Sequence, residues 1–208
     1  MFIEPQLNSF SKHQSGAGWI EVVCGSMFSG KTEELIRRVN RAIIAQQEVK
    51  IFKPSIDIRY HEVKVVSHNS NEALSSPVEY SEQILSLAGD ADVVAIDEAQ
   101  FMDEGLIDVC VKLANEGKRV IVCGLDMDFE GKPFGIMPQL MSIAEFITKL
   151  HAICMQCGDV ASFSYRLTAS KQKVVLGEKD AYEARCRKCF TEGMESKEEE
   201  MESVNENG

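Results

Sequence analysis

Four short runs rich in apolar residues recur along the first 125 residues of the chain. They cover residues 19–24 (WIEVVC), 48–53 (EVKIFK), 92–96 (DVVAI) and 119–123 (RVIVC). A glycine, a proline or an acidic residue follows each run directly. Short apolar runs of this kind are typical of strands that are buried on both faces of a parallel sheet. The pattern therefore predicts four buried strands.

Helical periodicity fills the intervals between these runs. In residues 32–47, apolar residues recur at Leu35, Ile36, Val39 and Ile43, and two glutamates occupy the first turn, where the helix dipole favours negative charge. Further elements are predicted as helices at 81–88, 105–116 and 138–146, and as weaker strands at 63–66 and 78–80. Alternating strands and helices predict an α/β fold of the P-loop (RecA-like) type, with helices on both faces of a parallel sheet and right-handed crossovers.

The charge is unevenly distributed. The chain has 208 residues and a formal net charge of −11, and the segment from Thr191 onward carries seven glutamates and one lysine, which is −6 of that total. Proteins that bind duplex nucleic acid generally need clustered lysine and arginine, and the sequence has no such cluster, so we expect no nucleic-acid partner. No apolar run approaches the roughly 18–20 residues that span a bilayer, and the N-terminus does not resemble a secretory signal. We therefore expect a cytoplasmic protein with no membrane partner.

The stretch that follows the first apolar run matches the phosphate-loop pattern G-x₄-G-K-[ST]. It consists of Gly25, Ser26, Met27, Phe28, Ser29, Gly30, Lys31 and Thr32. Glycines let consecutive backbone N–H groups turn toward one anion, and the helix that follows adds its N-terminal dipole. The lysine then reaches the β- and γ-phosphates, and the threonine hydroxyl ligates Mg²⁺. The alternative, a glycine-rich turn that matches by chance, is disfavoured by the strand before it and the helix after it.

Two carboxylates follow the third apolar run. Asp97 comes directly after four apolar residues, at the carboxyl end of a predicted strand, where ligands bind in open α/β sheets. We predict that Asp97 contributes to the magnesium site and that Glu98 takes a proton from the group that attacks the γ-phosphate. The alternative is an ordinary acidic strand end. Whether the attacking group is water, as in an ATPase, or a bound hydroxyl, as in a kinase, stays open at this point.

Three phenylalanines lie in segments that leave the predicted sheet near these carboxylates. Phe101 is three residues beyond Glu98, and Phe129 and Phe134 lie in the segment after the fourth strand. Aromatic rings near a general base suggest a flat, mostly uncharged acceptor such as a nucleobase. Phenylalanines next to loops are more often core residues, and composition does not decide between the two interpretations.

Two C-x₂-C pairs lie 28 residues apart: Cys154 with Cys157, and Cys186 with Cys189. Four thiolates complete a tetrahedral structural zinc site without an open position. A redox dithiol explains two pairs poorly, and we expect His151 to be a surface or packing residue instead of a ligand. The other three cysteines lie in apolar stretches and are expected to be small buried side chains: Cys24, Cys110 and Cys123.

These features divide the chain into four parts. We predict a flexible segment over 1–18, a P-loop nucleotide-binding domain over 19–150, a zinc-binding lid domain over 151–190, and an acidic disordered tail over 191–208. The segment between the two cysteine pairs is clamped at its base and can cover a substrate.

From about Trp19 to Phe190, the chain resembles the zinc-containing thymidine kinases of bacteria and the animal cytosol. The resemblance rests on an ordered set of motifs: GSMFSGKTEEL, KPSIDIRY, IDEAQF, LDMDFEGKPFG, CMQC, SYRL, VLGEKDAY and CRKC. It implies ATP-dependent phosphorylation of thymidine, or of deoxyuridine, at the 5′-hydroxyl, which yields dTMP in pyrimidine nucleotide salvage for DNA synthesis. The attacking group would then be a hydroxyl.

The resemblance also implies roles for individual residues. Glu98 takes the position of the general base, and Arg59 lies near the transferred phosphate, although a surface salt bridge is an alternative interpretation of Arg59. Gln100 joins the phosphate loop and Asp97 among the nucleotide contacts. The implied substrate contacts are Met27, Asp57, Phe101, Leu125, Phe129, Phe134, Ser164, Val175, Gly177 and Tyr182.

The same resemblance implies a homotetramer that is inhibited by dTTP. Two other classes of function compete with a nucleoside kinase. IDEAQ is similar to a helicase Walker B motif, but the chain lacks the length for a second nucleotide-binding lobe and lacks a basic strand-tracking groove. A non-catalytic zinc interaction module would leave the phosphate loop without a purpose.

Overall fold

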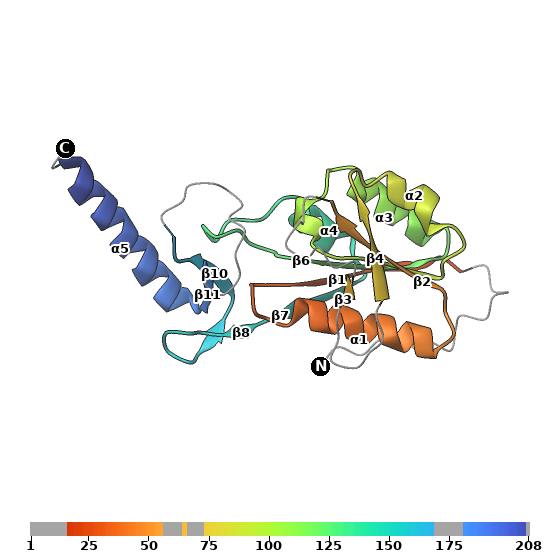
Figure 1. Ribbon diagram of the computed structural model, residues 1–208, viewed down its shortest axis with the longest axis horizontal. Helices are drawn as coiled ribbons and strands as arrows, with labels where there is room; N and C mark the ends of the chain where they lie inside the picture. The colour runs from red at the N-terminus through yellow and green to blue at the C-terminus, as the bar shows by residue number, and fades with distance from the viewer. Residues whose placement is uncertain (1–15, 56–63, 66–72, 169–180, 207–208) are drawn as a thin grey trace. The chain divides into compact units, whose positions relative to one another are not determined.

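The computed structural model describes residues 16–55, 64–65, 73–168 and 181–206 (Figure 1). The chain groups into two compact units. The larger unit comprises Met1–Cys24, Lys31–Asp126 and Pro133–Lys149, and the smaller comprises Gly25–Gly30, Met127–Lys132 and Leu150–Gly208. Residues Gly25–Gly30 of the phosphate loop and a short segment around Phe129 therefore group with the C-terminal part of the chain.

A seven-stranded sheet forms the larger unit, in the order β3-β4-β2-β5-β6-β1-β7. The strands are β1 (Trp19–Gly25), β2 (Val49–Pro54), β3 (Lys64–Val65), β4 (Ala73–Val78), β5 (Val93–Ile96), β6 (Arg119–Gly124) and β7 (Phe146–Leu150). The neighbours β4, β2, β5, β6 and β1 pair in parallel, whereas β3 joins β4 antiparallel at one edge. The predicted parallel sheet is confirmed, and all four apolar runs are strands in it.

Helices cover both faces of this sheet. They are α1 (Lys31–Ile44), α2 (Gln83–Ala88), the short 3₁₀ helix η2 (Ala99–Phe101), α3 (Leu106–Asn115) and α4 (Met137–Ile143). Figure 1 shows α1 on one face, and α2, α3 and α4 on the other. The helices predicted over 32–47, 81–88 and 105–116 are present, with ends that differ by a few residues. The fold is the predicted P-loop α/β class.

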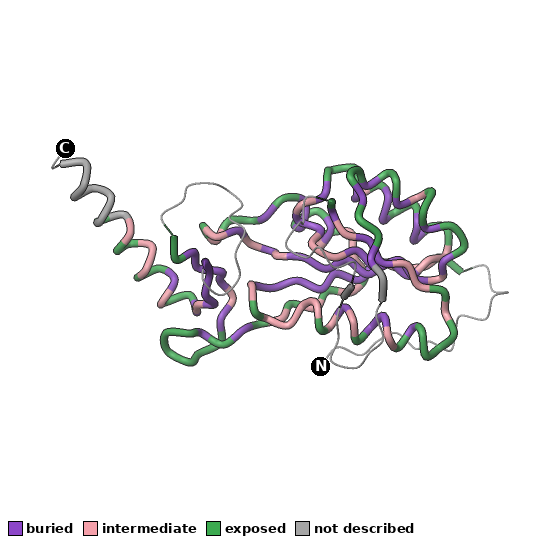
Figure 2. The backbone as a smooth tube through the Cα atoms, in the orientation of Figure 1, coloured by how far each residue is buried: buried purple, intermediate pink, exposed green. Residues whose placement is uncertain are grey.

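The main hydrophobic core lies between one face of the sheet and the helices α2, α3 and α4 that cover it. Alternate residues of β1, namely Ile20, Val22 and Cys24, belong to it together with buried side chains of those helices. The central strands are buried along their length (Figure 2). The three cysteines outside the C-x₂-C pairs are fully buried, as predicted.

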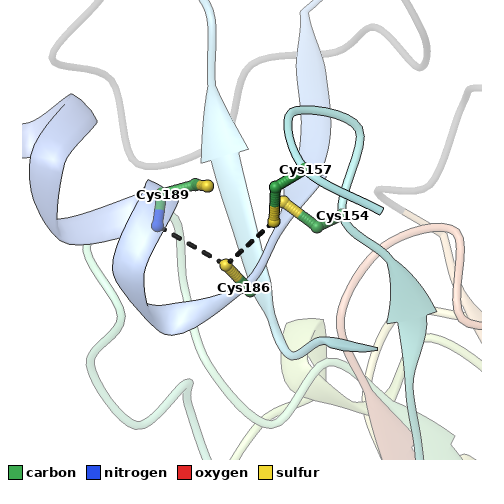
Figure 3. A group of neighbouring side chains, drawn as sticks. All are labelled: Cys154, Cys157, Cys186 and Cys189. Carbon is green, nitrogen blue, oxygen red and sulfur yellow. Dashed lines mark hydrogen bonds between the residues drawn. The ribbon is translucent and has the colours of Figure 1, made fainter. Parts of the chain in front are cut away.

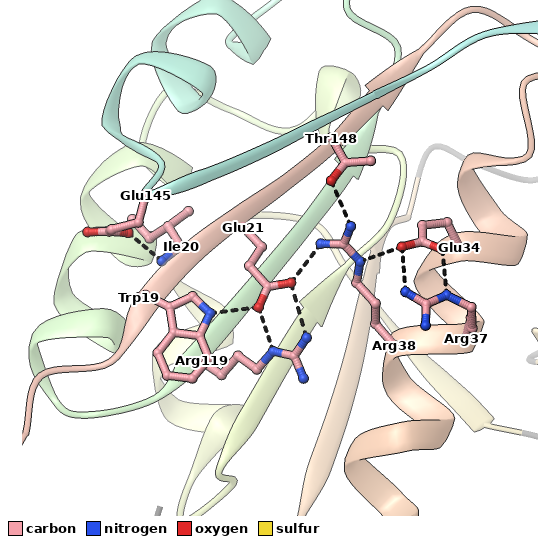
Figure 4. A network of polar contacts seen from close by, with 9 residues as sticks. All are labelled: Trp19, Ile20, Glu21, Glu34, Arg37, Arg38, Arg119, Glu145 and Thr148. Carbon is pink, nitrogen blue, oxygen red and sulfur yellow. Dashed lines mark hydrogen bonds and ion pairs between the residues drawn. The ribbon is translucent and has the colours of Figure 1, made fainter. Parts of the chain in front are cut away.

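The opposite face of β1 carries a buried charge. Glu21 is 0% exposed and accepts hydrogen bonds from Arg38 of α1 at 2.7 Å and from Arg119 of β6 at 2.7 and 3.1 Å (Figure 4). The indole N–H of Trp19 donates to the same carboxylate, and Arg38 also donates to Thr148 of β7. Burial alone would raise the pKa of Glu21, but these donors outweigh it and lower the pKa below its ordinary value. Helix α1 is thus linked, directly or through Glu21, to three strands.

The region after β6 differs from the prediction at one point. The helix expected over 138–146 ends at Ile143, where Ala144 takes an extended conformation, and Phe146–Leu150 forms the edge strand β7. Burial alternates between half-buried and exposed along β7, as expected of a strand covered on one face only. The short sequence FITKL suits both periodicities, and its pairing in the sheet decides for the strand.

In its described residues, the smaller unit contains two two-stranded antiparallel sheets and one helix. Strand β8 (Ala152–Ile153) pairs with β9 (Val160–Ala161), and β10 (Phe163–Arg166) pairs with β11 (Tyr182–Arg185). Helix α5 (Arg187–Glu206) follows directly.

Helix α5 runs through a segment for which the sequence predicted a disordered tail. Phe190 and Met194 of α5 pack with Phe163 and Tyr165 of β10, and the rings of Phe163 and Phe190 stack at 4.5 Å. These apolar anchors hold the start of the helix, and glutamate and lysine are good helix formers that allow it to continue.

Among the described residues, no helix has both the length and the apolar character that crossing a bilayer requires.

Candidate functional site

The loop between β1 and α1 has an unusual backbone. Gly25, Phe28 and Gly30 have φ angles of 144°, 63° and 83°, so half of the residues from 25 to 30 have positive φ. A Cβ atom on Gly25 would lie 2.3 Å from the carbonyl oxygen of Leu150, which excludes any larger residue. Such changes of backbone conformation turn successive N–H groups toward one point, as an anion-binding loop requires.

Helix α1 begins immediately after this loop. Lys31 and Thr32 are its first two residues, and Glu33 and Glu34 complete its first turn. The positive end of the helix dipole therefore lies at the predicted phosphate lysine, which favours an anion there.

The two predicted carboxylates follow β5. Because β1, β5 and β6 are parallel, Asp97 and Leu125 follow their strands at the sheet edge where β1 also ends. Burial of the carboxyl group and the neighbouring charge of Glu98 raise the pKa of Asp97 to about 6, whereas the Cys123 thiol and Lys31 oppose this shift. A cation here would relieve both the desolvation and the repulsion, so the carboxylate pair fits a divalent ion that prefers oxygen ligands, such as Mg²⁺.

Glu98 has a strained backbone. Its φ and ψ angles are 52° and 39°, in the left-handed region, and it immediately precedes η2. Residues other than glycine adopt this conformation at a cost of about 1–2 kcal/mol, and such strain concentrates at functional sites. The conformation turns the chain sharply between β5 and η2, and Glu98 stays partly exposed.

The side chain of Gln100 connects Glu98 to the segment after β6. Its Nε2 donates to Oε2 of Glu98 at 2.5 Å, and its Oε1 accepts from the backbone N–H of Leu125 at 2.9 Å. Gln100 is 4% exposed, so its amide is engaged inside the larger unit. Two glycines make room for Gln100. A Cβ atom added to Gly124 would lie 2.7 Å from Oε1 of Gln100, and one added to Gly135 would lie 2.6 Å from the carbonyl oxygen of Gln100. The sequence suggested Gln100 as a nucleotide contact and did not indicate this bridge.

Two of the predicted aromatic residues meet in the larger unit. The rings of Phe101 and Phe134 pack edge to face, with centroids 5.6 Å apart. Phe101 lies at the end of η2, and the backbone N–H of Phe134 donates to the carbonyl of Asp126 at 3.1 Å. The segments after β5 and β6 therefore bring these two rings together.

In the smaller unit, four other predicted contacts gather around the sheet formed by β10 and β11. The backbone N–H of Met27 donates to Oγ of Ser164 at 3.0 Å, which joins the phosphate loop to β10. Arg166 lies two residues further along β10, on the same face, and contacts both Phe129 and Tyr182. Arg166 was not among the site residues predicted from the sequence. The SYRL motif contains it, but only the strand register places it opposite Tyr182.

The segment that carries Phe129 is closed by Asp128. This buried carboxylate accepts hydrogen bonds from the backbone N–H groups of Glu130 and Lys132 at 2.9 and 3.0 Å, and Gly131 supplies a φ of 74°. Aspartate side chains stabilise tight turns in this way. The turn thereby holds Phe129 in the smaller unit.

The four paired cysteines form one group. Their sulfur atoms all lie within 4.8 Å of one another, and those of Cys157 and Cys186 are 3.6 Å apart (Figure 3). Burial acts to raise the pKa of Cys154, but backbone N–H groups around it outweigh burial and lower the pKa to about 6, whereas the neighbouring sulfur atoms raise the pKa of Cys189 to about 12. The group fits a tetrahedral zinc ion. His151 contacts Ser162 at 3.0 Å and lies outside the group, as expected.

Four predicted site residues lie outside the described residues: Asp57 and Arg59 in 56–63, and Val175 and Gly177 in 169–180. Their roles stay predictions from the sequence.

The sequence matches known proteins over most of its length. The family model described as thymidine kinase matches residues 18–190. The chain is 61% identical over 179 residues to a thymidine kinase of Rhodothermus sp. (strain ITI 518), covering 86% of this chain and 84% of that protein. It is 60% identical over 173 residues to a thymidine kinase of Bacteroides thetaiotaomicron, covering 83% and 87%. It is 57% identical over 182 residues to a thymidine kinase of Bacteroides fragilis (strain YCH46), covering 88% and 92%.

The matched region includes every motif on which the sequence resemblance rested, from the phosphate loop to the second cysteine pair. The parallel sheet and the four-cysteine group agree with that resemblance. The chain belongs to the thymidine kinase family.

Proposed function

We propose that this protein transfers the γ-phosphoryl group of ATP to the 5′-hydroxyl of thymidine, and of deoxyuridine, and yields dTMP for nucleotide salvage. Membership of the thymidine kinase family supports the reaction. The observation that carries its mechanism is the geometry around Glu98. This residue is a partly exposed carboxylate in a strained turn directly after β5, next to Asp97 and anchored by Gln100.

The donor nucleotide is bound by the loop between β1 and α1. The backbone N–H groups of residues 25–30 surround the phosphates, and Lys31 pairs with the β- and γ-phosphate oxygens. Thr32 and Asp97 would hold Mg²⁺, which, when bound, neutralises charge on the phosphates. Arg59 stabilises the charge of the transferred group.

Glu98 acts as the general base. Its carboxylate accepts the proton of the 5′-hydroxyl as that oxygen forms its bond to the γ-phosphorus, and the bond from the γ-phosphorus to the bridging oxygen breaks to release ADP. The hydrogen bond from Nε2 of Gln100 orients this carboxylate. The left-handed backbone of Glu98 further limits the positions that the carboxylate can take.

The nucleoside is bound by aromatic, apolar and small polar residues. The flat base packs against the aromatic rings, and backbone groups of the segment between the cysteine pairs read its edge. The contributing residues are Met27, Asp57, Phe101, Leu125, Phe129, Phe134, Ser164, Val175, Gly177 and Tyr182.

The four-cysteine group would hold a structural zinc ion. Because Cys154, Cys157, Cys186 and Cys189 supply four thiolates, such an ion would have a structural role, fixing the base of the segment between the two pairs, and would supply no chemistry to the reaction.

The test of this function compares wild-type protein with Glu98→Gln, using thymidine, deoxyuridine, deoxycytidine and uridine with Mg-ATP. We expect dTMP from thymidine, and a kcat about 10²–10⁴-fold lower in Glu98→Gln, because general-base catalysis contributes this much. The matched control is Glu104→Gln, which changes an exposed carboxylate just before α3 and should behave as wild type.

Three results would contradict the proposal. Full turnover by a folded Glu98→Gln variant would show that Glu98 is not the general base. Absence of dTMP formation by the wild type would show that thymidine is not a substrate. ATP hydrolysis that needs nucleic acid and no nucleoside would favour a motor ATPase instead.

We also propose that dTTP inhibits the enzyme and that the protein is a homotetramer. Both follow from the resemblance to the zinc-containing thymidine kinases. Inhibition kinetics with dTTP, and the mass of the particle in solution by light scattering, test the two statements separately.

A further inference from the structure

Arg166 lies between two aromatic side chains of the smaller unit. Its guanidinium carbon is 3.5 Å from the ring centroid of Phe129, and its Nε and Nη2 donate to the hydroxyl oxygen of Tyr182 at 3.1 and 2.8 Å. Arg166 is only 2% exposed, and Tyr182 is 7% exposed. The three residues come from different parts of the chain, and the guanidinium group joins them.

We propose that Arg166 is a positioning residue of the nucleoside site. It fixes the plane of Phe129 and makes the Tyr182 hydroxyl a hydrogen-bond donor to an acceptor oxygen of the bound nucleoside. The inference rests on the proposed function, which assigns Phe129 and Tyr182 to the nucleoside, and it adds a residue and a direction of hydrogen bonding that the proposed function does not contain.

The direction of the hydrogen bond follows from the capacity of a phenol. A hydroxyl oxygen has two acceptor lone pairs and one O–H to donate. Arginine carries five N–H donors and no acceptor, so both contacts from Arg166 must be donated to the oxygen of Tyr182. The two lone pairs are thereby occupied. The phenolic O–H points away from Arg166, and the bond that it can still make is as a donor.

The stacking on Phe129 needs a planar cation. A separation of 3.5 Å places the guanidinium carbon in van der Waals contact with the ring face, and the flat group covers that face. Phe129 therefore has one face against Arg166, and the residue as a whole stays partly exposed. Lysine could supply the charge, but it could not supply the flat surface together with two parallel donors.

The strand register explains why Arg166 reaches this position. In the antiparallel pair, Arg166 lies directly opposite Tyr182, and Ser164 lies opposite Ala184 on the same face. Side chains at alternate positions of β10 point to the other face, where aromatic residues pack against α5. One face of this small sheet thus packs against α5, and the other face carries residues of the proposed nucleoside site.

The structural face contains a natural control. Arg185 stacks on Tyr165 with its guanidinium carbon 3.4 Å from the ring centroid, in close similarity to Arg166 on Phe129. The hydroxyl of Tyr165 donates to the carbonyl of Gly193 in α5 at 2.9 Å. Arg185→Lys and Tyr165→Phe therefore perturb the same sheet by the same chemical changes, on the face that is not assigned to substrate.

The experiment measures kcat, the KM for thymidine and the KM for ATP in the full-length, zinc-loaded protein. We expect Arg166→Lys and Tyr182→Phe each to raise the KM for thymidine about tenfold, the equivalent of one hydrogen bond, while the KM for ATP and kcat change less than about threefold. In the double variant, Arg166→Lys should add less than it costs alone, because the part that acts through the Tyr182 hydroxyl is already lost and only the stacking on Phe129 remains. Arg185→Lys and Tyr165→Phe should leave the KM for thymidine unchanged.

Two results would overturn the inference while leaving the proposed function intact. One is an unchanged KM for thymidine in Arg166→Lys, with a loss of thermal stability equal to that of Arg185→Lys. The other is full additivity of Arg166→Lys and Tyr182→Phe. If the wild type does not phosphorylate thymidine, the proposed function itself fails and the inference falls with it.

Discussion

The side-chain amide of Gln100 holds Glu98 by one end and the backbone N–H of Leu125 by the other, with hydrogen bonds of 2.5 and 2.9 Å. The bridge crosses from the end of β5 to the end of β6, two neighbouring parallel strands. It ties the proposed general base to the first residue after β6, which we assign to the nucleoside. In the proposed mechanism, the buried side chain of Gln100 therefore fixes the position of the general base relative to a residue that contacts the nucleoside.

Gln100→Met should lower kcat about tenfold or more while the KM values for ATP and thymidine change little. Methionine keeps the length and volume of the side chain but removes the amide, and a hydrogen bond to a charged group contributes about 1.5–3 kcal/mol. Steady-state kinetics separate the two parameters. The control is Gln83→Met, which removes an amide that accepts from the backbone of Glu79 and Tyr80 at the start of α2, and it should keep wild-type kinetics. A rise in KM with unchanged kcat would assign Gln100 to substrate binding instead.

Because the backbone of Glu98 is left-handed, a glycine variant at this position should be more stable than an alanine variant, which is the reverse of the usual order. Both Glu98→Ala and Glu98→Gly remove the carboxylate and its bond to Gln100, so they differ only in the backbone. At φ 52° we expect the glycine variant to be more stable than the alanine variant by about 1 kcal/mol in urea unfolding. At Glu104, which is not among the residues with positive φ, the same pair of substitutions should show the ordinary order. If Glu98→Ala is more stable than Glu98→Gly, the backbone of Glu98 is not strained.

Loss of one thiol should release zinc without unfolding the parallel sheet. Cys186→Ser breaks the four-sulfur group, and we expect the zinc content to fall from about one ion per chain to near zero, since structural sites need all four ligands. Elemental analysis measures this. Cys110→Ser is the control, because Cys110 is also buried but lies in the core of the larger unit, and it should lower stability while keeping the metal. Equal zinc in both variants would contradict the site.

The central strands of the parallel sheet could be predicted from the sequence because they are short and mostly apolar. A run such as VVAI is buried on both faces wherever its neighbours lie, so the pattern by itself identifies the element. The edge strand β7 could not be identified in this way, since FITKL contains three apolar and two polar residues without a clear alternation, and the helix predicted over 138–146 included only its first residue. The start of α5 depends on the packing of Phe190 against Phe163, a contact between residues that the sequence does not show to be neighbours.

The candidate site divides along the same line. The phosphate loop, Asp97, Glu98 and the cysteine pairs are local patterns, and the sequence predicts a role for each from spacing alone. Arg166 and the bridging role of Gln100 depend on strand register and on which segments lie side by side. Such relationships appear only once the chain is folded.

Glu34 should stabilise the protein at neutral pH and lose this effect in acid. Its carboxylate accepts from Arg37 at 2.7 and 2.9 Å and from Arg38 at 2.8 Å, and these bonds, chiefly that of Arg37, lower the pKa of Glu34 to about 2. A lowered folded-state pKa means that the stabilisation is complete above the ordinary value near 4.5 and disappears as the pH falls toward 2. We expect Glu34→Gln to be less stable than wild type by about 1 kcal/mol at neutral pH, because solvent screens part of the interaction.

The measurement for Glu34 is the difference in the free energy of unfolding between the two proteins from neutral pH down to the region of the lowered pKa, since acid effects common to both cancel. The difference should shrink as the pH falls below 4.5. Glu33→Gln removes the same charge from an exposed position one residue earlier and should cost less at neutral pH. A difference that grows in acid would have the wrong sign for a lowered pKa.

Glu21 should be the most costly single charge to remove from the larger unit. Its buried carboxylate accepts from Arg38, Arg119 and Trp19, so Glu21→Gln removes the negative charge that two buried guanidinium groups share, while Arg38 keeps its ion pair with Glu34. Breaking one partner of a buried ion pair costs about 3–5 kcal/mol, whereas replacing all partners by apolar residues is often neutral. We therefore expect a loss of about that size in urea unfolding for Glu21→Gln, and a substantial recovery in the triple variant Glu21→Leu, Arg38→Met, Arg119→Met. If the triple variant is less stable than Glu21→Gln, the fold requires the ion network itself, and the loss in Glu21→Gln does not come from the uncompensated buried positive charge.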